Sequence, residues 1–268
     1  MSRPTTVPPH YHRKRLVTWL LVALLLVLVY FSAKECRVDH QLFSSGVGEG
    51  LRFLTELFPP DYSTFSEMLY PALETIMIAL LATVLGALFS LAFALAGAAN
   101  LAPLWLKSLS RLAMALERAL PEIIVILLLV AALGLGPFPG VVALSIGCLG
   151  MLGRLFADAI EEVDAKTMEA VASVGATKAQ IIRYVVLPQV MPSLIANTLF
   201  RLEINIRLSV LLGAVGAGGI GYEIFYSFQL LEYERASMAI LVVLALVFFS
   251  ERLSDFLRNR LIPEGKLK

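Results

Sequence analysis

Long apolar runs alternate with short polar segments along most of this chain. Six of the runs are long enough to be transmembrane helices, because a helix needs about 20 residues to cross the hydrocarbon core of a bilayer. The sequence therefore predicts an all-α membrane protein with six transmembrane helices. The predicted spans are residues 16–33, 71–99, 112–135, 139–157, 192–214 and 236–256.

The first run could be mistaken for the core of a signal peptide, because the basic residues Arg13, Lys14 and Arg15 precede it. A signal peptide would end in a small-residue cleavage site. Lys34 and Glu35 follow this run instead. We therefore expect a helix that is retained in the mature protein.

The longest connection between predicted spans covers residues 34–70. Within it, "GVGEGLRFLTELFPP" places apolar residues near helical spacing before two prolines that end the run. We expect a helix that lies in the membrane interface, and a disordered loop is the alternative. The glycine-rich stretch after the fifth span, "GAVGAGGIGYEIFYSF", is expected to be a flexible outside turn.

Composition agrees with a membrane protein, because 58% of the residues are hydrophobic and only 16% are charged, which lies outside the range of soluble domains. Lys and Arg residues gather in alternate connections, as they do in cytoplasmic loops. This bias predicts that both termini are cytoplasmic. Only four basic residues then fall in outside loops: Lys34, Arg37, Arg52 and Arg235.

The connection between the fourth and fifth spans carries the signals of two short helices. Asp164 can cap the first helix, and Gly175 stands where a left-handed helix terminator is expected. Thr177 and Gln180 form a capping box for a second helix, which Pro188 is expected to end. A few residues would be enough to join two spans. We therefore expect this cytoplasmic insert to be bound by something outside the membrane.

The insert resembles the coupling signature of permeases of ATP-binding-cassette (ABC) importers, E-A-A-x3-G-x9-I-x-L-P. Val171 replaces the second alanine of that signature and Val185 replaces the isoleucine. The resemblance implies a cytoplasmic coupling helix that docks in a cleft of a separate ATPase subunit; an ordinary amphipathic connector is the alternative. The coupling residues would be Glu169, Ala170, Gly175, Ala176, Leu187 and Pro188.

A second resemblance covers most of residues 50–256. "RALPEIIVILLLVAALGLGPFPGVVAL" (118–144) and "LPQVMPSLIANTLFRLEINIRLSVLLGAVGAGGIG" (187–221) are similar to permeases of phosphonate, phosphite and hypophosphite importers. The resemblance implies a type I ABC importer transmembrane domain over residues 71–257. Residues 1–70 would hold the basic segment, the first helix and a periplasmic interfacial segment, and residues 258–268 a cytoplasmic tail.

The same resemblance implies the assembly and the location of the protein. A second permease copy, an ABC ATPase dimer and a periplasmic or lipid-anchored substrate-binding protein would be the partners, in the lipid of the bacterial inner membrane. ATP and Mg would be bound by the ATPase, so we expect no cofactor on this chain, and no nucleic acid partner. Phosphonate, phosphite and hypophosphite stay open as substrates.

The sequence argues against several other kinds of site. No G-x-x-x-x-G-K-[ST] motif occurs, so we expect no phosphate loop on this chain. The pattern G-x-G-x-x-G, which begins at Gly216, follows a predicted membrane helix rather than a strand, which excludes a dinucleotide site. His10, His12 and His40 lie outside the apolar core, so neither a zinc peptidase nor an intramembrane hydrolase is expected.

Charged residues inside the predicted spans need an explanation, because an Arg or Asp near a helix centre costs about 2.5 to 3.5 kcal/mol. Glu203 and Arg207 lie four residues apart on one face of the fifth span and could form an internal pair. Arg201 and Asn205 lie on nearly the opposite face, and Glu122 stands near the start of the third span. The two glutamates could simply neutralise the two arginines between helices.

The functional hypothesis is that these residues line an anion pathway, with Arg207 as first choice and Glu203 holding it between transport cycles. Arg201, Asn205 and Glu122 are second choices. The sequence thus favours an importer permease for phosphorus oxyanions, not an enzyme. The alternatives are an ABC permease for another small substrate such as an amino acid, or an ATP-independent secondary carrier, although no internal repeat supports a carrier.

Overall fold

The computed structural model describes the backbone of residues 9–36 and 40–261, and the side chains from Val17, with a gap at residues 37–43. The histidines at 10, 12 and 40 therefore fall outside the described side chains. By its internal contacts the chain divides into two units, residues 1–56 and residues 57–268. Every element in the described residues is helical, so the prediction of an all-α fold is confirmed.

The first unit contains two helices, α1 (Pro9–Glu35) and α2 (His40–Glu56). The apolar side chains of α1 from Val17 to Phe31 are exposed, which suits a helix surrounded by lipid. The helix expected before the two prolines is confirmed as α2, and its place in the membrane interface stays a prediction.

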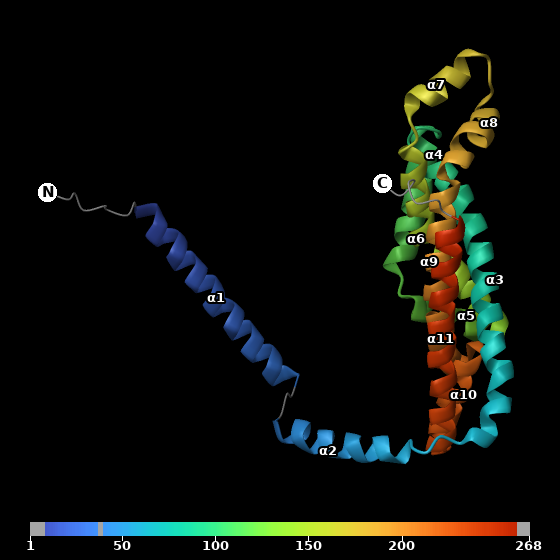
Figure 1. The fold of residues 1–268 in the computed structure, drawn as a ribbon. Coiled ribbons are helices and arrows are strands. Elements are labelled where there is room, and N and C mark those ends of the chain that lie inside the picture. The colour runs from blue at the N-terminus through green and yellow to red at the C-terminus, as the bar shows by residue number, and fades with distance from the viewer. Residues whose placement is uncertain (1–8, 37–39, 262–268) are drawn as a thin grey trace. The chain divides into compact units, whose positions relative to one another are not determined.

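The second unit is a bundle of helices (Figure 1). A short 3-10 turn, η1 (Tyr62–Thr64), leads into α3 (Phe65–Gly97). The chain continues through α4 (Leu104–Ala119), α5 (Glu122–Leu133) and α6 (Pro137–Glu161). It ends with α9 (Leu187–Leu212), α10 (Ile220–Gln229) and α11 (Tyr233–Leu261).

The centre of this unit is the contact between α3 and α6. Gly86 of α3 lies so close to Cys148 of α6 that an added Cβ would be 2.4 Å from the cysteine Cβ. Ala82, Ala94 and Leu152 are among the buried residues around this contact. Small residues let helix backbones approach closely in a membrane, where dispersion contacts replace the hydrophobic effect between helices.

The number of spans differs from the prediction of six. Among the described residues, four helices are long and apolar enough to cross a membrane, or five if the pair Lys178–Ala217 and Ile220–Gln229, bent by 53°, is counted as one span. The third predicted span, 112–135, is instead divided between α4 and α5. Leu120 is extended at the break (φ −91°, ψ 123°) because the ring of Pro121 disfavours helical backbone in the residue before it.

The turn predicted after the fifth span is also different. After α9, the segment η3 (Gly213–Ala217) loses helical backbone geometry at Val215 and at Gly216 (φ 96°), and Gly218 and Gly219 then adopt positive φ angles of 76° and 71°. The rest of the stretch forms α10, so the expectation of a flexible turn over all of "GAVGAGGIGYEIFYSF" was wrong. The backbone of α10 satisfies its own hydrogen bonds, which favours a helix wherever water is scarce.

Candidate coupling insert and intramembrane polar site

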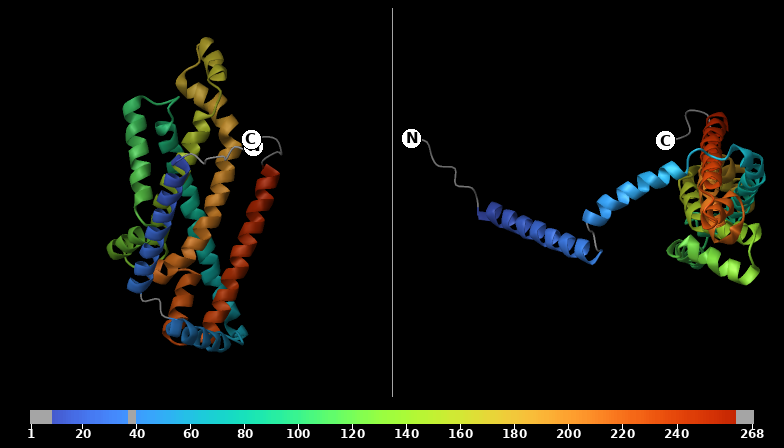
Figure 2. Two further views of the ribbon diagram at one scale, coloured as in Figure 1. Left: turned by 90° about the vertical axis from the view of Figure 1, so that its left-hand side faces the viewer. Right: turned by 90° about the horizontal axis from the view of Figure 1, so that it is seen from below.

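The insert between α6 and α9 contains α7 (Ala165–Ser173), α8 (Lys178–Ile181) and a π-helical segment, η2 (Ile182–Val186). In two views it projects beyond one end of the bundle, while α10 lies at the other end (Figures 1 and 2). Every residue of α7 and α8 is at least partly exposed. The insert therefore offers both helices to a partner.

The local signals for the first helix of the insert work as expected. The Asp164 carboxylate accepts a hydrogen bond from the Lys166 backbone N–H (3.0 Å) and caps α7. Gly175 follows the end of α7 with φ = +89°. An added side chain there would meet nothing within 4 Å. The backbone conformation alone therefore demands glycine at this position.

The second helix begins as expected and ends differently. The Thr177 N–H donates to Oε1 of Gln180 (2.8 Å), and the Gln180 N–H donates to Oγ1 of Thr177 (3.4 Å), which completes the capping box. Pro188 was expected to end this helix, and that expectation was wrong. Leu187 and Pro188 are instead the first residues of α9, and the Leu187 N–H still donates to the carbonyl of Ile182 in the preceding π-helical segment. As a result α8, η2 and α9 follow one another without a loop.

Among the predicted coupling residues, Glu169, Ala170 and Pro188 are exposed, and Ala176 and Leu187 are partly buried. Glu169 lines a pocket of about 330 Å³ between the insert and the connection from α3 to α4. Other residues that line this pocket are Asn100, Leu101, Ala165, Met168, Ala172, Lys178, Ile181 and Ile182.

The polar residues of α9 divide into two environments. Arg201 is buried, with a relative exposure of 4%, and its Nη2 donates to Oε1 of Glu122 at 3.0 Å. Asn205, also buried, donates to Oγ1 of Thr83 (2.8 Å) and lies 3.4 Å from Sγ of Cys148. This cluster joins α9 to α3, α5 and α6. The contact between Arg201 and Glu122 thus supports the alternative in which Glu122 neutralises Arg201 between helices.

Two polar atoms in this cluster remain without a hydrogen-bond partner in the described structure: Nε of Arg201 and Oδ1 of Asn205. A buried polar group without a partner costs free energy. A buried water molecule could satisfy such a donor or acceptor.

The internal pair expected between Glu203 and Arg207 is not formed. Arg207 instead pairs with Glu251 of α11, and Arg258 of α11 donates to Oε1 of Glu203 at 3.5 Å. The side chain of Arg207 is 48% exposed and that of Glu203 is 11% exposed. Two ion pairs therefore connect α9 to α11.

Glu74 was missed by sequence reasoning. Its Oε2 accepts the backbone N–H of Gly219 (2.7 Å), and Oγ1 of Thr75 accepts the N–H of Ile220 (2.9 Å). These two residues of α3 satisfy the free N–H groups at the start of α10. A carboxylate at the start of an otherwise apolar run was the available signal.

Known proteins that are similar to this chain are also membrane transport components. Residues 89–263 match the family described as "Binding-protein-dependent transport system inner membrane component". The chain belongs to this family. It is therefore a multi-pass component of the inner membrane and a permease subunit rather than an enzyme. The matched region includes the insert and all five polar residues of the intramembrane set.

Two relatives come from Stutzerimonas stutzeri. One, provisionally named phosphite transport system permease protein HtxC, is 36% identical over 247 residues, which is 92% of this chain and 86% of the relative. The phosphite transport system permease protein PtxC is 38% identical over 205 residues, 76% of this chain and 74% of the relative. Both similarities extend over most of each protein.

A solved structure of the methionine ABC transporter MetNI in an inward-facing conformation has the same permease fold. Its matching chain has a TM-score of 0.65 and 20% identity, and the match covers 76% of this chain and all of that chain. The expectation of a type I ABC importer fold is confirmed. At this identity the similarity concerns the fold alone.

Proposed function

We propose that this chain forms the membrane pathway of an ATP-driven importer for phosphorus oxyanions such as phosphonate, phosphite or hypophosphite. The part of the proposal that concerns coupling to an ATPase rests on the exposed, capped insert, which continues directly into α9. The substrate class is supported by relatives named for phosphite transport that match over most of their length.

The complete transporter in this proposal contains two permease copies, an ATPase dimer and a substrate-binding protein outside the membrane. ATP and Mg are bound by the ATPase, because the sequence of this chain has no phosphate-loop motif. The pocket beside Glu169, at the exposed end of the bundle, is the surface offered to the ATPase.

The insert faces the cytoplasm in this proposal. Basic residues at the insert end of the second unit include Lys107 at the start of α4, Lys166 in α7 and Lys178 in α8. Arg235, near the start of α11, belongs to the opposite end and pairs with Glu67 and Glu223 (both 3.3 Å). An excess of unpaired positive charge at one end favours the cytoplasmic side for it.

Coupling follows from the continuity of α8, η2 and α9. A displacement of the insert by the ATPase is transmitted along the backbone of α9, because helical hydrogen bonds resist stretching and no loop absorbs the movement. Arg201 and Arg207 move with that helix. The ion pairs from α9 to α5 and α11 are then the contacts that change between transport states.

Arg207 is the residue we assign to anion passage. Its guanidinium is half exposed, and its partner Glu251 is also exposed (44%), so an arriving oxyanion can replace the carboxylate. A guanidinium binds such an anion with two parallel hydrogen bonds and keeps its charge. Glu251 takes the holding role first assigned to Glu203. Arg201, Glu122 and Asn205 then act as packing contacts between helices.

The deciding experiment is substrate-stimulated ATP hydrolysis by the complete transporter in liposomes. Phosphonate, phosphite and hypophosphite are compared with methionine, because the MetNI structure shares the fold. Stimulation by a phosphorus compound and not by methionine supports the proposal. Uptake by the permease alone, without ATP, would show an independent carrier and reject it.

A further inference from the structure

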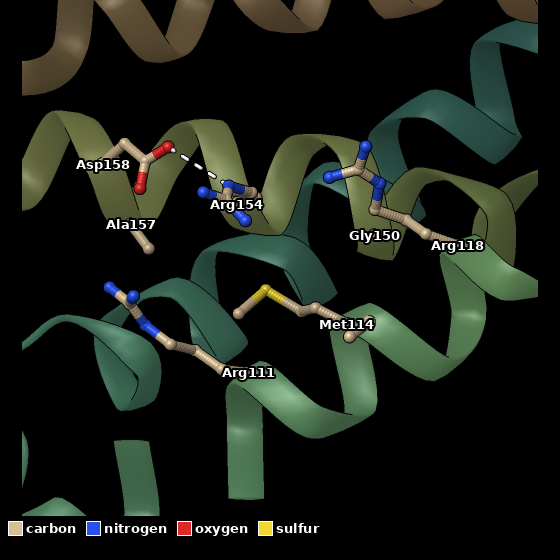
Figure 3. Close-up of a pocket in the computed structure, with 8 residues that line it drawn as sticks. Arg111, Met114, Arg118, Gly150, Arg154, Ala157 and Asp158 are labelled. Atoms are coloured by element: carbon tan, nitrogen blue, oxygen red, sulfur yellow. Dashed lines mark ion pairs between the residues drawn. The ribbon is translucent and has the colours of Figure 1, made fainter. Parts of the chain in front are cut away.

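A small pocket between α4 and α6 contains three arginines and is separate from the residues assigned to transport. Its volume is about 80 Å³. Arg111 and Arg118 come from α4, and Arg154 comes from α6 (Figure 3). The other residues around it are Met114, Ala115, Gly150, Ala157 and Asp158.

The three arginines differ in how strongly they pair with acidic residues of the described protein. Arg111 is engaged, because its Nη2 lies 2.6 Å from Oε1 of Glu161 and its Nε donates to the carbonyl of Gly97 (3.1 Å). Among the described residues, the ion pair found for Arg154 is with Asp158, at 3.6 Å and one helical turn away, with both side chains about half exposed or more. Such a surface pair contributes little to stability.

Of the three arginines, Arg118 is the least engaged in ion pairs and hydrogen bonds. Within the part of the chain that the structure describes, it makes no ion pair and no side-chain hydrogen bond is found for it. Its sequence neighbour Glu117 is not one of the residues that line the pocket, although the Glu117 carboxylate also lies against Gly150 and interacts electrostatically with Arg118. Its own aliphatic stem also packs on Gly150, which holds the guanidinium at the pocket.

The pocket lies at the level where lipid phosphates are expected. Arg111 contacts the last residues of α3 and α6, so it marks the end of those spans on the insert side. Arg154 is seven residues before the end of α6, or about 10 Å along the helix axis. The polar headgroup layer on each side of a bilayer is about 5–7 Å thick. With the ends of α3 and α6 at the outer edge of that layer, the pocket from Arg111 to Arg154 extends from the layer to the edge of the hydrocarbon.

The outer face of α4 is apolar and exposed beside the pocket. Four large side chains repeat at intervals of four, three and four residues, with relative exposures of 55–68%. This spacing places them in one stripe along the helix. A tryptophan at the end of such a stripe is typical of a membrane interface. The four are Trp105, Leu109, Leu112 and Leu116.

We propose that Arg111, Arg118 and Arg154 form a binding site for a phosphate group that carries a free negative charge. A guanidinium donates parallel hydrogen bonds to phosphate oxygens, arginines from two helices line this pocket, and its volume of about 80 Å³ suits one phosphate group rather than a larger solute. The exposed apolar stripe makes the headgroup of an anionic phospholipid the favoured source. Free inorganic phosphate presents the same chemistry and is the other source.

Occupation of this site would join α4 to α6 through the ligand. Since α4 leads into the break at Pro121 and α6 leads into the insert, the bound phosphate would stiffen the region between them. The inference is independent of the proposed substrate, because its test measures binding and not transport.

The test uses the complete transporter, purified in a neutral detergent and exposed to phosphatidylglycerol or phosphatidylcholine with the same acyl chains. Native mass spectrometry counts the bound lipids. We expect the wild-type protein to retain phosphatidylglycerol in preference, because choline shields the phosphate charge. Arg118→Gln and Arg154→Gln should each weaken that preference about tenfold, as expected for the loss of one charge-assisted hydrogen bond.

Arg252→Gln is the matched control, because Arg252 is an exposed arginine on α11 that stacks on Phe248 (4.9 Å) and is remote in sequence from the pocket. It removes the same charge and should leave the preference unchanged. Arg118→Lys keeps the charge and should keep most of the binding. If the Arg118→Gln complex fails to assemble, Arg154→Gln alone decides the question, because the ion pair of Arg154 with Asp158 is exposed.

A parallel measurement separates the two sources. Inorganic phosphate is added to delipidated complex and the midpoint of thermal unfolding is recorded. A rise that Arg118→Gln abolishes, with no preference among lipids, would assign the site to a free oxyanion. A lipid preference and a phosphate response that are both unaffected by the arginine variants, or that Arg252→Gln reduces equally, would overturn the proposal.

Discussion

Two arginines on α9, six residues apart, show how position decides the role of a side chain. Arg201 is buried against Glu122, whereas Arg207 is half exposed beside Glu251. A buried ion pair is costly to break, because the remaining charge is left without solvent or a partner. An exposed pair is easily exchanged, since water can replace either member. We therefore assign a structural role to Arg201 and a role in anion passage to Arg207.

This difference predicts unequal effects on stability. Glu122→Ala should destabilise the purified complex by about 3 kcal/mol, because it leaves the Arg201 charge buried. Glu251→Ala should cost less than about 1 kcal/mol if Arg207 faces a water-filled pathway, as we propose. Thermal unfolding of both variants checks the prediction. Equal shifts for the two would place Arg207 in a dry environment and remove the basis for its role.

Transport should depend on the charge of Arg207. We expect Arg207→Gln to reduce substrate uptake at least about tenfold, since an anion then loses a charge-assisted contact. Arg207→Lys should reduce uptake less, because it keeps the charge and loses only the two-pronged geometry. Both variants should still bind the ATPase. Normal uptake by Arg207→Gln would show that this residue is structural.

At the scale of elements, one proline divides a helix and another does not. Pro121 separates α4 from α5, and the 12 residues of α5 span only about 18 Å, less than the hydrocarbon core of about 30 Å. Pro188 begins α9 after a π-helical segment, so the insert and the membrane helix form one continuous path. The difference follows from where each proline lies relative to the first turn of its helix.

The turn at Gly175 should be the most sensitive position of the insert. Gly175→Val should leave the permease folded and inserted, because a side chain there meets open space. It should disturb the end of α7, since a left-handed conformation costs about 1–2 kcal/mol for a residue with a Cβ. We expect loss of ATPase binding or of coupling between ATP hydrolysis and uptake.

Gly175→Asn is the matched control for this prediction. Asparagine tolerates the left-handed conformation better than other residues with a Cβ, so it should retain more coupling than valine does. Copurification with the ATPase and the ratio of ATP hydrolysed to substrate imported are the measurements. Wild-type values for Gly175→Val would reject the assignment of this insert as the coupling element.

At the scale of the whole molecule, the insert and the turn after α10 lie at opposite ends of the second unit (Figure 1). If the spans cross a bilayer, these ends face different compartments. We expect the insert to face the cytoplasm, because the basic residues around it follow the positive-inside rule. That orientation decides which end binds an ATPase and which end receives substrate.

Labelling of single cysteines should reveal this orientation. In a Cys36→Ser background, where the remaining Cys148 is buried, Ser173→Cys marks the insert and Gln229→Cys marks the end of α10. Both positions are exposed. A thiol reagent that cannot cross the membrane should label Gln229→Cys in intact cells, and Ser173→Cys only after the membrane is opened. The reverse pattern would invert the topology and exclude a cytoplasmic ATPase at the insert.

The helical class, the two capped helices of the insert and the glycine terminator between them can be predicted from the sequence. These features are local: a helix in lipid satisfies its own backbone hydrogen bonds, and a cap involves residues two or three positions apart. The polar residues of α9 could be selected for the same reason, because a charge within an apolar run is visible without knowing its neighbours.

The partners of those charges, in contrast, depend on how the helices pack in three dimensions. Glu203 and Arg207 satisfy the local rule for an ion pair, yet each pairs with α11, whose residues lie more than 40 positions away. Glu74 likewise caps a helix that begins 146 residues later, at Ile220. Such contacts depend on how helices pack, and several partners of opposite charge compete for each side chain. The spacing along one helix is therefore insufficient to choose among them.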